Sequence, residues 1–282
     1  MRLLSNFLLY SNLWIAIAAV CMAIQTPFIL TQSLKLEAYH GLIFFGTLFL
    51  YAAHRLIGLR RILGIHQEGR FAVIRKLQTL VIILAIISAI LTAYFLYQIP
   101  RDIILWLLPA GLASAAYVFP VLKNNQRLRD INHIKIFLIA LVWAWISGFI
   151  PAFLFIHESF KVSLLISLER FFFIFAITLP FDIRDMKIDA AAQVKTLPAT
   201  IGINATKKLA YLCLFIMILF ASWIFLLDKY SLSVLYALVL SSLICLVLIY
   251  HSKPDRPDYY YTGFLDGTMI LQFLLVLGSQ WV

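Results

Sequence analysis

Long uninterrupted runs of apolar residues dominate this sequence, and its polar residues gather in the segments between them. A helix needs roughly 20 apolar residues to cross the ~30 Å hydrocarbon core of a bilayer. Runs of that length predict nine membrane-spanning helices, at residues 9–30, 39–59, 77–97, 102–120, 134–156, 162–181, 208–227, 231–250 and 262–281. No run alternates with a period of two, so the pattern favours helices over a β-barrel. We expect an all-α integral membrane bundle that forms one domain, residues 1–282.

The basic residues lie mainly in alternate loops, which orients the predicted bundle. If the N-terminus faces the cytoplasm, the cytoplasmic segments hold 17 of the 23 lysines and arginines, and the outer segments hold four. Cytoplasmic loops of membrane proteins are enriched in Lys and Arg, so the sequence predicts an N-in, C-out topology. Arg2 then precedes a first span that is too long for the apolar part of a signal peptide.

Composition excludes several classes of protein. With 63% hydrophobic and 13% charged residues, the chain is too apolar for a soluble globule. The net charge of +10 comes from loop residues rather than from a basic stripe, so we expect no nucleic acid as a partner. Cys21, Cys213 and Cys245 fall in the middle of spans without metal-binding spacing, which is typical of small buried residues. We expect a multi-pass protein surrounded by membrane lipids, in a bacterial cytoplasmic membrane.

Three aspartates follow the sixth span, where we expect Pro180 to end the helix and a loop to cover residues 182–207. They are Asp182, Asp185 and Asp189. On a helical continuation, this spacing would place all three on one face. Such close carboxylates repel one another unless a cation lies among them, and Mg²⁺ held by carboxylates and substrate phosphates would fit. The alternative is a solvated loop in which Arg184 and Lys187 neutralise the acids.

The stretch that contains these aspartates resembles the second aspartate-rich motif of the UbiA superfamily of intramembrane prenyltransferases. That motif has the form DxRDxxxD, followed by a basic residue, Thr-Leu-Pro and a glycine, and the chain reads FDIRDMKIDAAAQVKTLPATIG from Phe181 to Gly202. The run YVFPVLK, from Tyr117 to Lys123, is similar to the family's Tyr-x-x-Pro-Leu-Lys signature at the end of the fourth helix. Nine helices, an N-in topology and long cytoplasmic loops after the second and sixth helices also agree with this family.

The resemblance implies an activity and a set of site residues. Members of the family join an allylic prenyl diphosphate to a lipophilic, often aromatic, acceptor in a central apolar cavity that opens to the cytoplasm. The three aspartates would hold Mg²⁺, and Tyr117 would lie beside the prenyl chain near its leaving carbon. Asp182, Asp185 and Tyr117 are thus the expected catalytic residues. The residues expected to bind the diphosphate are Asn12, Arg55, Lys123, Arg184 and Lys195.

The first aspartate-rich motif of the family, NDxxDxxxD, is lost in this chain. The matching stretch reads LYAAHRLIG, in which Leu50 and Tyr51 replace Asn-Asp, His54 replaces the second Asp and Gly58 replaces the third. A single imidazole is a poor magnesium ligand set, so we expect one Mg²⁺ rather than two. Arg55 is interpreted either as a direct substitute for the missing metal or as an anchor whose long side chain reaches the membrane surface.

Two classes of function follow from this pattern. The intact second motif favours a prenyltransferase, which is the main expectation, and the lost first motif favours a non-catalytic protein that binds a polyprenyl lipid or lipid phosphate. Asn12 and Asp266 are expected near the cytoplasmic ends of the first and ninth helices, at the depth of His54. A carboxylate inside a span is costly, which makes Asp266 a further candidate for the cavity.

Overall fold

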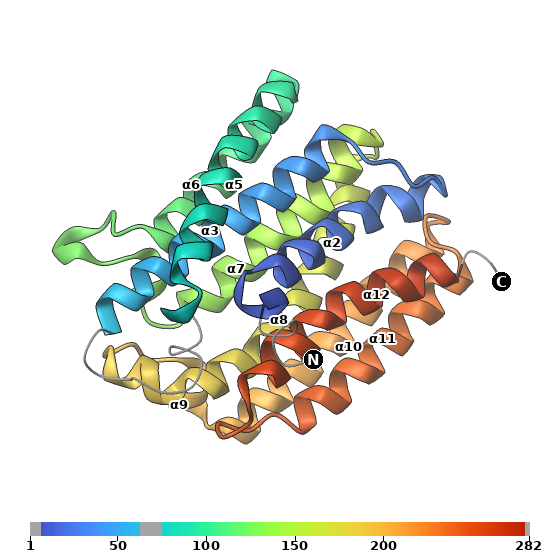
Figure 1. Cartoon of the computed structure of the whole chain (residues 1–282). Coiled ribbons are helices and arrows are strands. Elements are labelled where there is room, and N and C mark those ends of the chain that lie inside the picture. The colour runs from blue at the N-terminus through green and yellow to red at the C-terminus, as the bar shows by residue number, and fades with distance from the viewer. Residues whose placement is uncertain (1–6, 63–74, 280–282) are drawn as a thin grey trace.

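The computed structural model describes residues 7–62 and 75–279, which form helices joined by short connections, with no strand among them. Nine segments within these residues are long and apolar enough to cross a membrane. This confirms the predicted all-α bundle, whose helices lie side by side in Figure 1. The long loop expected after the second helix lies largely within residues 63–74, outside the described residues. Arg2 also lies outside them.

The elements follow the predicted spans closely, apart from their ends. They are α2 (Leu13–Thr31), α3 (Ala38–Ile62), α5 (Gln78–Gln98), α6 (Arg101–Val118), the 3₁₀ turns η1 (Lys123–Asn125) and η2 (Leu128–Asp130), α7 (Ile134–Ala144) with the π-helical turns η3 (Trp145–Phe149) and η4 (Pro151–Phe155), α8 (Phe160–Ala191), α9 (Leu197–Ile201), α10 (Ile203–Leu226), α11 (Leu232–Tyr250), the π-helical η5 (Tyr260–Leu265) and α12 (Asp266–Gly278).

The first predicted span is interrupted near its start. A short helical turn ends at Tyr10, and α2 begins only at Leu13. Between them Asn12 has a φ of 71°, in the left-handed region that stops a right-handed helix and that Asn tolerates better than most residues. The expected helix start at residue 9 is therefore wrong by four residues, and the chain changes direction directly before α2.

The sixth predicted span does not end at Pro180, so our expectation of a loop from residue 182 is wrong. α8 passes through Pro180 and continues to Ala191. Proline removes one backbone N–H from the helix, but packed membrane helices tolerate this loss. Ile183 and Asp185 remain buried in the continuation, so packing favours a continued helix. The helix ends beside Gln193, which has a φ of 57°. The three aspartates therefore lie on one rigid helix.

The turn between α9 and α10 explains the glycine of the second motif. Gly202 has a φ of 84°, a backbone conformation that side-chain-bearing residues rarely adopt, and it both ends α9 and begins α10. Pro198 lies in the first turn of α9, where its missing N–H costs nothing. The Thr-Leu-Pro and Gly positions thus set a sharp helix–helix corner after α8.

A widened helix replaces ordinary α-helix around Pro151. In a π-helical turn the Ile146 carbonyl would accept a hydrogen bond from the residue five positions on, which is Pro151 and has no N–H. The Tyr39 hydroxyl donates to this carbonyl instead, at 2.5 Å. Thr26 donates to the next carbonyl, that of Ser147, at 2.7 Å. Side chains of α2 and α3 therefore satisfy the backbone where this helix widens.

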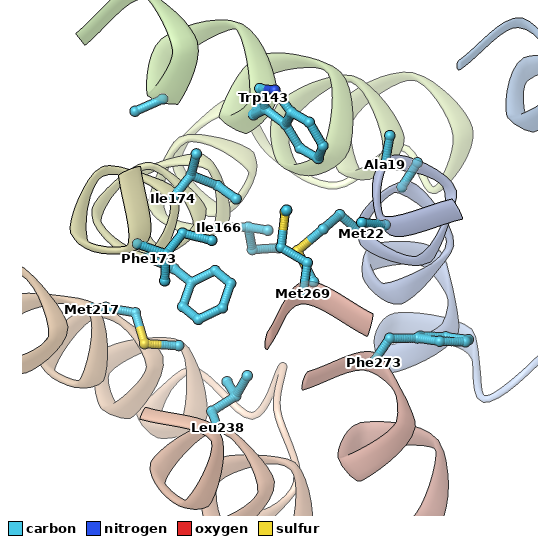
Figure 2. Close-up of a cluster of buried hydrophobic side chains, with 14 of the residues drawn as sticks. Ala19, Met22, Trp143, Ile166, Phe173, Ile174, Met217, Leu238, Met269 and Phe273 are labelled. Carbon is cyan, nitrogen blue, oxygen red and sulfur yellow. The ribbon is translucent and has the colours of Figure 1, made fainter. Parts of the chain in front are cut away.

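Two regions of packing divide the bundle. On one side α8 packs against α10 and α11, and α12 packs against α2 and α11; together these helices bury a continuous core that includes Met22, Phe173, Met217 and Met269 (Figure 2). On the other side α5 packs along α3, at the margin of the bundle in Figure 1. Between these regions the ends of α2, α3, α6, α7, α8 and α12 surround a cavity.

Gly148 provides a test of the packing between η3 and α8. A Cβ at Gly148 would lie 3.1 Å from the Ser167 Cα, whereas one at Gly111 would meet nothing within 4 Å. We expect Gly148→Leu to lower the free energy of unfolding by about 1–3 kcal/mol through overpacking. The matched variant Gly111→Leu should be neutral. The measurement is the melting temperature of each purified protein in detergent, and equal values for the two variants would contradict the close packing.

Candidate functional site

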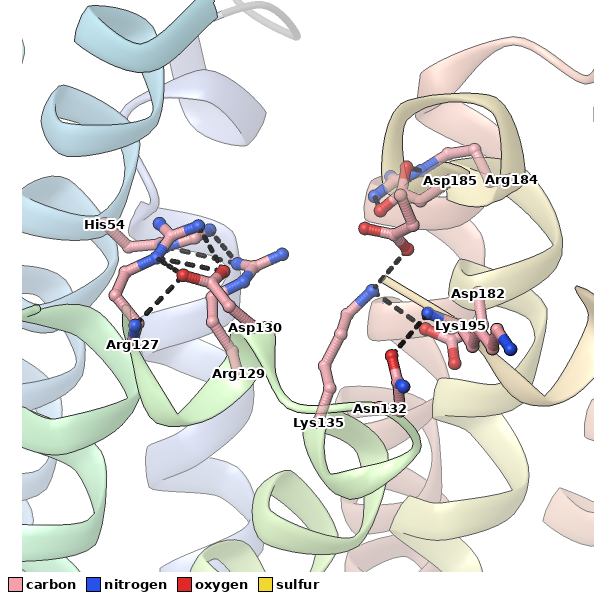
Figure 3. Close-up of polar contacts among 11 residues, drawn as sticks. His54, Arg127, Arg129, Asp130, Asn132, Lys135, Asp182, Arg184, Asp185 and Lys195 are labelled. Atoms are coloured by element: carbon pink, nitrogen blue, oxygen red, sulfur yellow. Dashed lines mark hydrogen bonds and ion pairs between the residues drawn. The ribbon is translucent and has the colours of Figure 1, made fainter. Parts of the chain in front are cut away.

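The cavity has a volume of about 880 Å³ and is lined by both apolar and charged side chains. Its part toward the middle of the spans is largely apolar, with Ile15, Val142 and Ile146 in the lining. Its other part lies between the ends of α3 and α8 and carries the charged residues (Figure 3). This is the end of the bundle that the charge pattern assigns to the cytoplasm. The cavity thus joins an apolar chamber to a charged mouth.

Most of the residues singled out in the sequence meet in this cavity. Its lining includes His54, Arg55, Tyr117, Asp182, Arg184, Asp185, Asp189 and Asp266. Lys123 and Lys195 lie elsewhere, with exposed side chains, and the Lys195 backbone N–H binds the Asn132 side chain at 2.7 Å. Asn12 is fully buried next to the cavity but outside its lining, and both polar atoms of its side chain lack a hydrogen bond.

Lys135 lies between two of the aspartates on α8. Its Nζ is 2.8 Å from Asp182 Oδ1 and 3.3 Å from Asp189 Oδ2. All three side chains are buried, and each carries a charge that burial alone would make costly. The Asp182 oxygen is close to the ammonium without the angle of a hydrogen bond, so this buried atom accepts none. The lysine therefore neutralises the two acids only in part.

Arg184 pairs with Asp185, the aspartate of the motif that Lys135 does not contact, and joins α8 to the segment before η5. It pairs with Asp185 through two bonds of 2.8 and 3.0 Å and with Asp258 through one of 2.8 Å. Its guanidinium also lies over the rings of Phe181 and Tyr261. This planar fork matches two carboxylates at once, which a lysine ammonium cannot do with the same geometry.

The opposite wall of the cavity is basic. Arg127 pairs with Asp130 at 2.8 Å, and these residues close a short turn on themselves. Burial alone would raise the pKa of Asp130, but hydrogen bonds from Arg127 hold that pKa below its ordinary value, so the carboxylate stays charged. The pair fixes the loop between α6 and α7 against the cavity.

Arg129 extends from the same loop to α3. Its Nη1 lies 2.5 Å from Nε2 and 3.3 Å from Nδ1 of His54, and its guanidinium lies 5.2 Å from the centre of the Tyr117 ring. Burial acts against the charge of Arg129, but Tyr117 and the carboxylates of Asp189 and Asp185 outweigh it and raise the pKa of Arg129. This arginine is therefore a permanent cation in the cavity.

Arg55 anchors the segment that precedes α2. It donates to the carbonyls of Tyr10 and Leu9, at 2.7 and 3.0 Å, and its guanidinium lies 5.5 Å from the centre of the Tyr10 ring. Burial and the neighbouring Asp258 carboxylate raise the pKa of Tyr10 to about 12, so this phenol remains a neutral donor. The contacts connect α3 through Tyr10 and Asp258 to Arg184.

Charge is segregated between the two walls. The wall built by α8 and α12, with the segment before η5, contributes the acidic side chains of Asp182, Asp185, Asp189, Asp258 and Asp266 against one cation of its own, Arg184, and Lys135 reaches this wall from α7. The wall built by α3 and the loop before α7 contributes Arg55, Arg127 and Arg129 against the single carboxylate of Asp130 among the described residues. One side therefore has an excess of negative charge suited to a cation, and the other an excess of positive charge suited to an anion.

A family model matches residues 72–271, which is most of the chain, and it describes the UbiA prenyltransferase family. The chain belongs to the UbiA prenyltransferase family. The match begins after the altered stretch from Leu50 to Gly58, and it includes the second motif from Phe181 to Gly202. The family and the nine apolar helices together identify an integral, multi-pass membrane protein.

Solved structures share the fold at low sequence identity. A UbiA homolog from Archaeoglobus fulgidus bound to GPP and Mg²⁺ has a TM-score of 0.69 and 16% identity, over 98% of this chain and 100% of that one. A UbiA homolog from Archaeoglobus fulgidus bound to Cd²⁺ has a TM-score of 0.59 and 15% identity, over 95% of this chain and 99% of that one. A digeranylgeranylglyceryl phosphate synthase has a TM-score of 0.59 and 13% identity over all of both chains. The search of curated proteins returns no match.

Four cavity residues of this UbiA-family chain were missed as site candidates in the sequence. Arg127, Arg129 and Lys135 fit the excess of basic residues in cytoplasmic loops equally well, and Asp258 lies in a short connection that contains other charged residues and no motif. Only the fold shows that they face the aspartates. The loop between α6 and α7 carried one usable signal, because it places Arg127 and Arg129 shortly after the Tyr117–Lys123 signature.

Replacing Arg184 tests whether this ion-paired wall supports the fold. Arg184→Met leaves Asp185 and Asp258 without their shared cation, so we expect a loss of stability of about 3 kcal/mol. Lys187, three residues along α8, is exposed, and Lys187→Met is the matched control that removes the same charge without effect. Thermal unfolding of the two variants in detergent gives the comparison. If both melted like the wild type, the Arg184 ion pairs would contribute nothing to stability.

Proposed function

We propose that this UbiA-family chain transfers a prenyl group from a prenyl diphosphate to a lipophilic acceptor within the membrane. The observation that supports this most is the continuity of the cavity, in which an apolar chamber opens directly into a charged mouth that contains the second-motif aspartates. A prenyl diphosphate has the same two parts, an apolar chain and an anionic head. The UbiA homolog structures bound to GPP and DMAPP support this class of ligand through the shared fold.

The aspartates on α8 are the residues that would hold one Mg²⁺. They fit such an ion because their wall has an excess of carboxylates and because Asp182 Oδ1 is buried without a hydrogen bond. Their oxygens do not form a ready cluster, since no group of three His, Cys, Asp or Glu among the described residues is close enough to hold a metal. Lys135 shares the space. When bound, the ion would supply positive charge that stabilises the departing diphosphate.

The other charged groups would act on the same diphosphate. In the transfer the allylic carbon–oxygen bond breaks and its electron pair leaves with the diphosphate. The acceptor then supplies the electron pair of the new bond and releases a proton. Arg129 and Arg184 would stabilise the negative charge that develops on the leaving group. The rings of Tyr51 and Tyr117 line the cavity where they would face the cationic carbon.

A second function is favoured by one specific observation. Lys135 already lies between Asp182 and Asp189, and the acids of the first motif are absent. The same cavity would therefore suit a protein that binds a polyprenyl phosphate through its head group and does not break it. A bacterial cytoplasmic membrane, where positive-inside loops face the cytoplasm, is the proposed location for either function.

A transfer assay separates these two functions. Purified protein in nanodiscs is incubated with labelled geranyl diphosphate and a bacterial lipid extract, with Mg²⁺ and with a chelator, and diphosphate release and prenylated products are measured. A prenyltransferase releases diphosphate in step with formation of a prenylated lipid. Tight binding of geranyl diphosphate with neither product would support the second function. No binding in any condition would refute both.

The apolar chamber gives a prediction with an adjacent control. Val142 lines the cavity, while its neighbour Leu141 is 59% exposed on the outer surface of the bundle. Val142→Trp should weaken binding of geranyl diphosphate about tenfold or more, because an indole fills space that the prenyl chain needs. Leu141→Trp should bind like the wild type. Binding is measured by microscale thermophoresis, and equal affinities for both variants would place the prenyl chain elsewhere.

A further inference from the structure

The guanidinium of Arg129 is held by two side chains that carry no formal negative charge. His54 contacts it from α3, at 2.5 Å through Nε2 (Figure 3). Tyr117 contacts it from α6 through its ring. Three other cations of the mouth have closer anionic partners: Arg127 pairs with Asp130, Lys135 with Asp182 and Arg184 with Asp258. Among the described residues no carboxylate lies within 4.0 Å of the Arg129 guanidinium. Its charge is therefore available to a ligand in the cavity.

The contact with His54 determines what this histidine does. A guanidinium has only donor hydrogens, so the ring nitrogen that it approaches must accept. A metal ion would bind His54 through the same lone pair, so this nitrogen cannot serve the arginine and a metal together. His54 occupies the position of the second acid in the first motif of the family, yet here it orients an arginine. The other acid positions hold Tyr51 and Gly58, which offer no carboxylate.

The surroundings also oppose a metal ion at this wall. Arg55, Arg127 and Arg129 all line it. Asp130 is the one carboxylate among the described residues of this wall, and it pairs with Arg127. Among the residues that the structure describes, a divalent cation here would meet an excess of positive charge and no carboxylate other than Asp130, in a partly buried site where charges interact strongly. The residues present do not fit the first of two metal ions. They fit an anion.

We propose that Arg129, positioned by His54 and Tyr117, takes the place of the first metal ion and binds one phosphate of the prenyl diphosphate directly. This rests on the proposed function and specifies how the head group is held. One phosphate contacts the fixed guanidinium on the α3 wall, and the aspartates of α8, with at most one divalent ion, serve the other side. Arg129 is the ligand-binding residue, and His54 is a positioning residue that acts through it.

The number of metal ions in the loaded protein tests this proposal without any variant. Wild-type protein is saturated with geranyl thiolodiphosphate, a slowly ionising analogue, and titrated with Mn²⁺ while free Mn²⁺ is followed by electron paramagnetic resonance. We expect no more than one bound Mn²⁺ per chain. Two bound ions would overturn the proposal while leaving the proposed function intact. If the analogue does not bind in any condition, the proposed function itself fails.

Variants of the two residues then test the role of each. Arg129→Met should weaken binding of the analogue by about 10- to 100-fold, the usual worth of a hydrogen bond to a charged group. His54→Leu, which removes the acceptor, should weaken binding in the same direction. His54→Gln keeps an acceptor oxygen and should restore most of the affinity. A purely structural histidine would not distinguish the two replacements.

The matched control is Lys208→Met, which removes one exposed positive charge from the same end of the bundle. It should bind the analogue as the wild type does. If Arg129→Met is folded, as judged by gel filtration and melting temperature, and binds as tightly as Lys208→Met, the proposal is wrong. If Arg129→Met does not fold, the count of Mn²⁺ in the wild type decides.

Discussion

The ion pairs of Lys135 with Asp182 and Asp189 show the constraint on which this molecule depends: a charge placed at membrane depth needs a partner. The same constraint explains Arg184, which serves Asp185 and Asp258 together. It extends to the middle of the bundle, where the buried Arg170 donates to the Met22 carbonyl at 2.8 Å and lies 3.8 Å from Glu169. Lys135 thus connects α7 to α8, and Arg170 connects α8 to α2, so buried charges join residues that are distant in sequence.

That network also gives the cavity its polarity. The cavity lining holds several ion pairs, but its two walls differ in composition, with more acidic than basic side chains beside α8 and more guanidinium groups than carboxylates beside α3. An uneven distribution of this kind holds a ligand in one orientation, because an anionic head with a bound cation fits only one way round. The apolar chamber behind it then receives whatever chain the head carries. The charges of the mouth therefore set the orientation of the ligand, and the apolar contacts of the chamber retain its chain.

Much of the fold was predictable from the sequence because membrane spans need only length and apolarity. The nine runs located the helices, and the spacing of Asp182, Asp185 and Asp189 gave their common face once the helix continued. The errors came from local backbone rules. Pro180 is a strong helix breaker in water but a weak one in a packed bundle. Asn12 interrupts a run that apolarity alone would extend. The partners of the aspartates were harder to predict, since Arg129 and Lys135 have the same appearance as charges that set topology.

α8 has a property that follows from its continuity. It runs without interruption from its cap at Ser159, at one end of the bundle, to Ala191 at the other, and so the acids and the buried core share one helical register. Inserting a single residue anywhere between Val162 and Ile177 would rotate everything beyond it by about 100° and advance it by about 1.5 Å. The carboxylates would then turn out of the cavity, and the core side chains of α8 beyond the insertion would turn with them. The distance along α8 from the buried core to the site is therefore fixed to the residue.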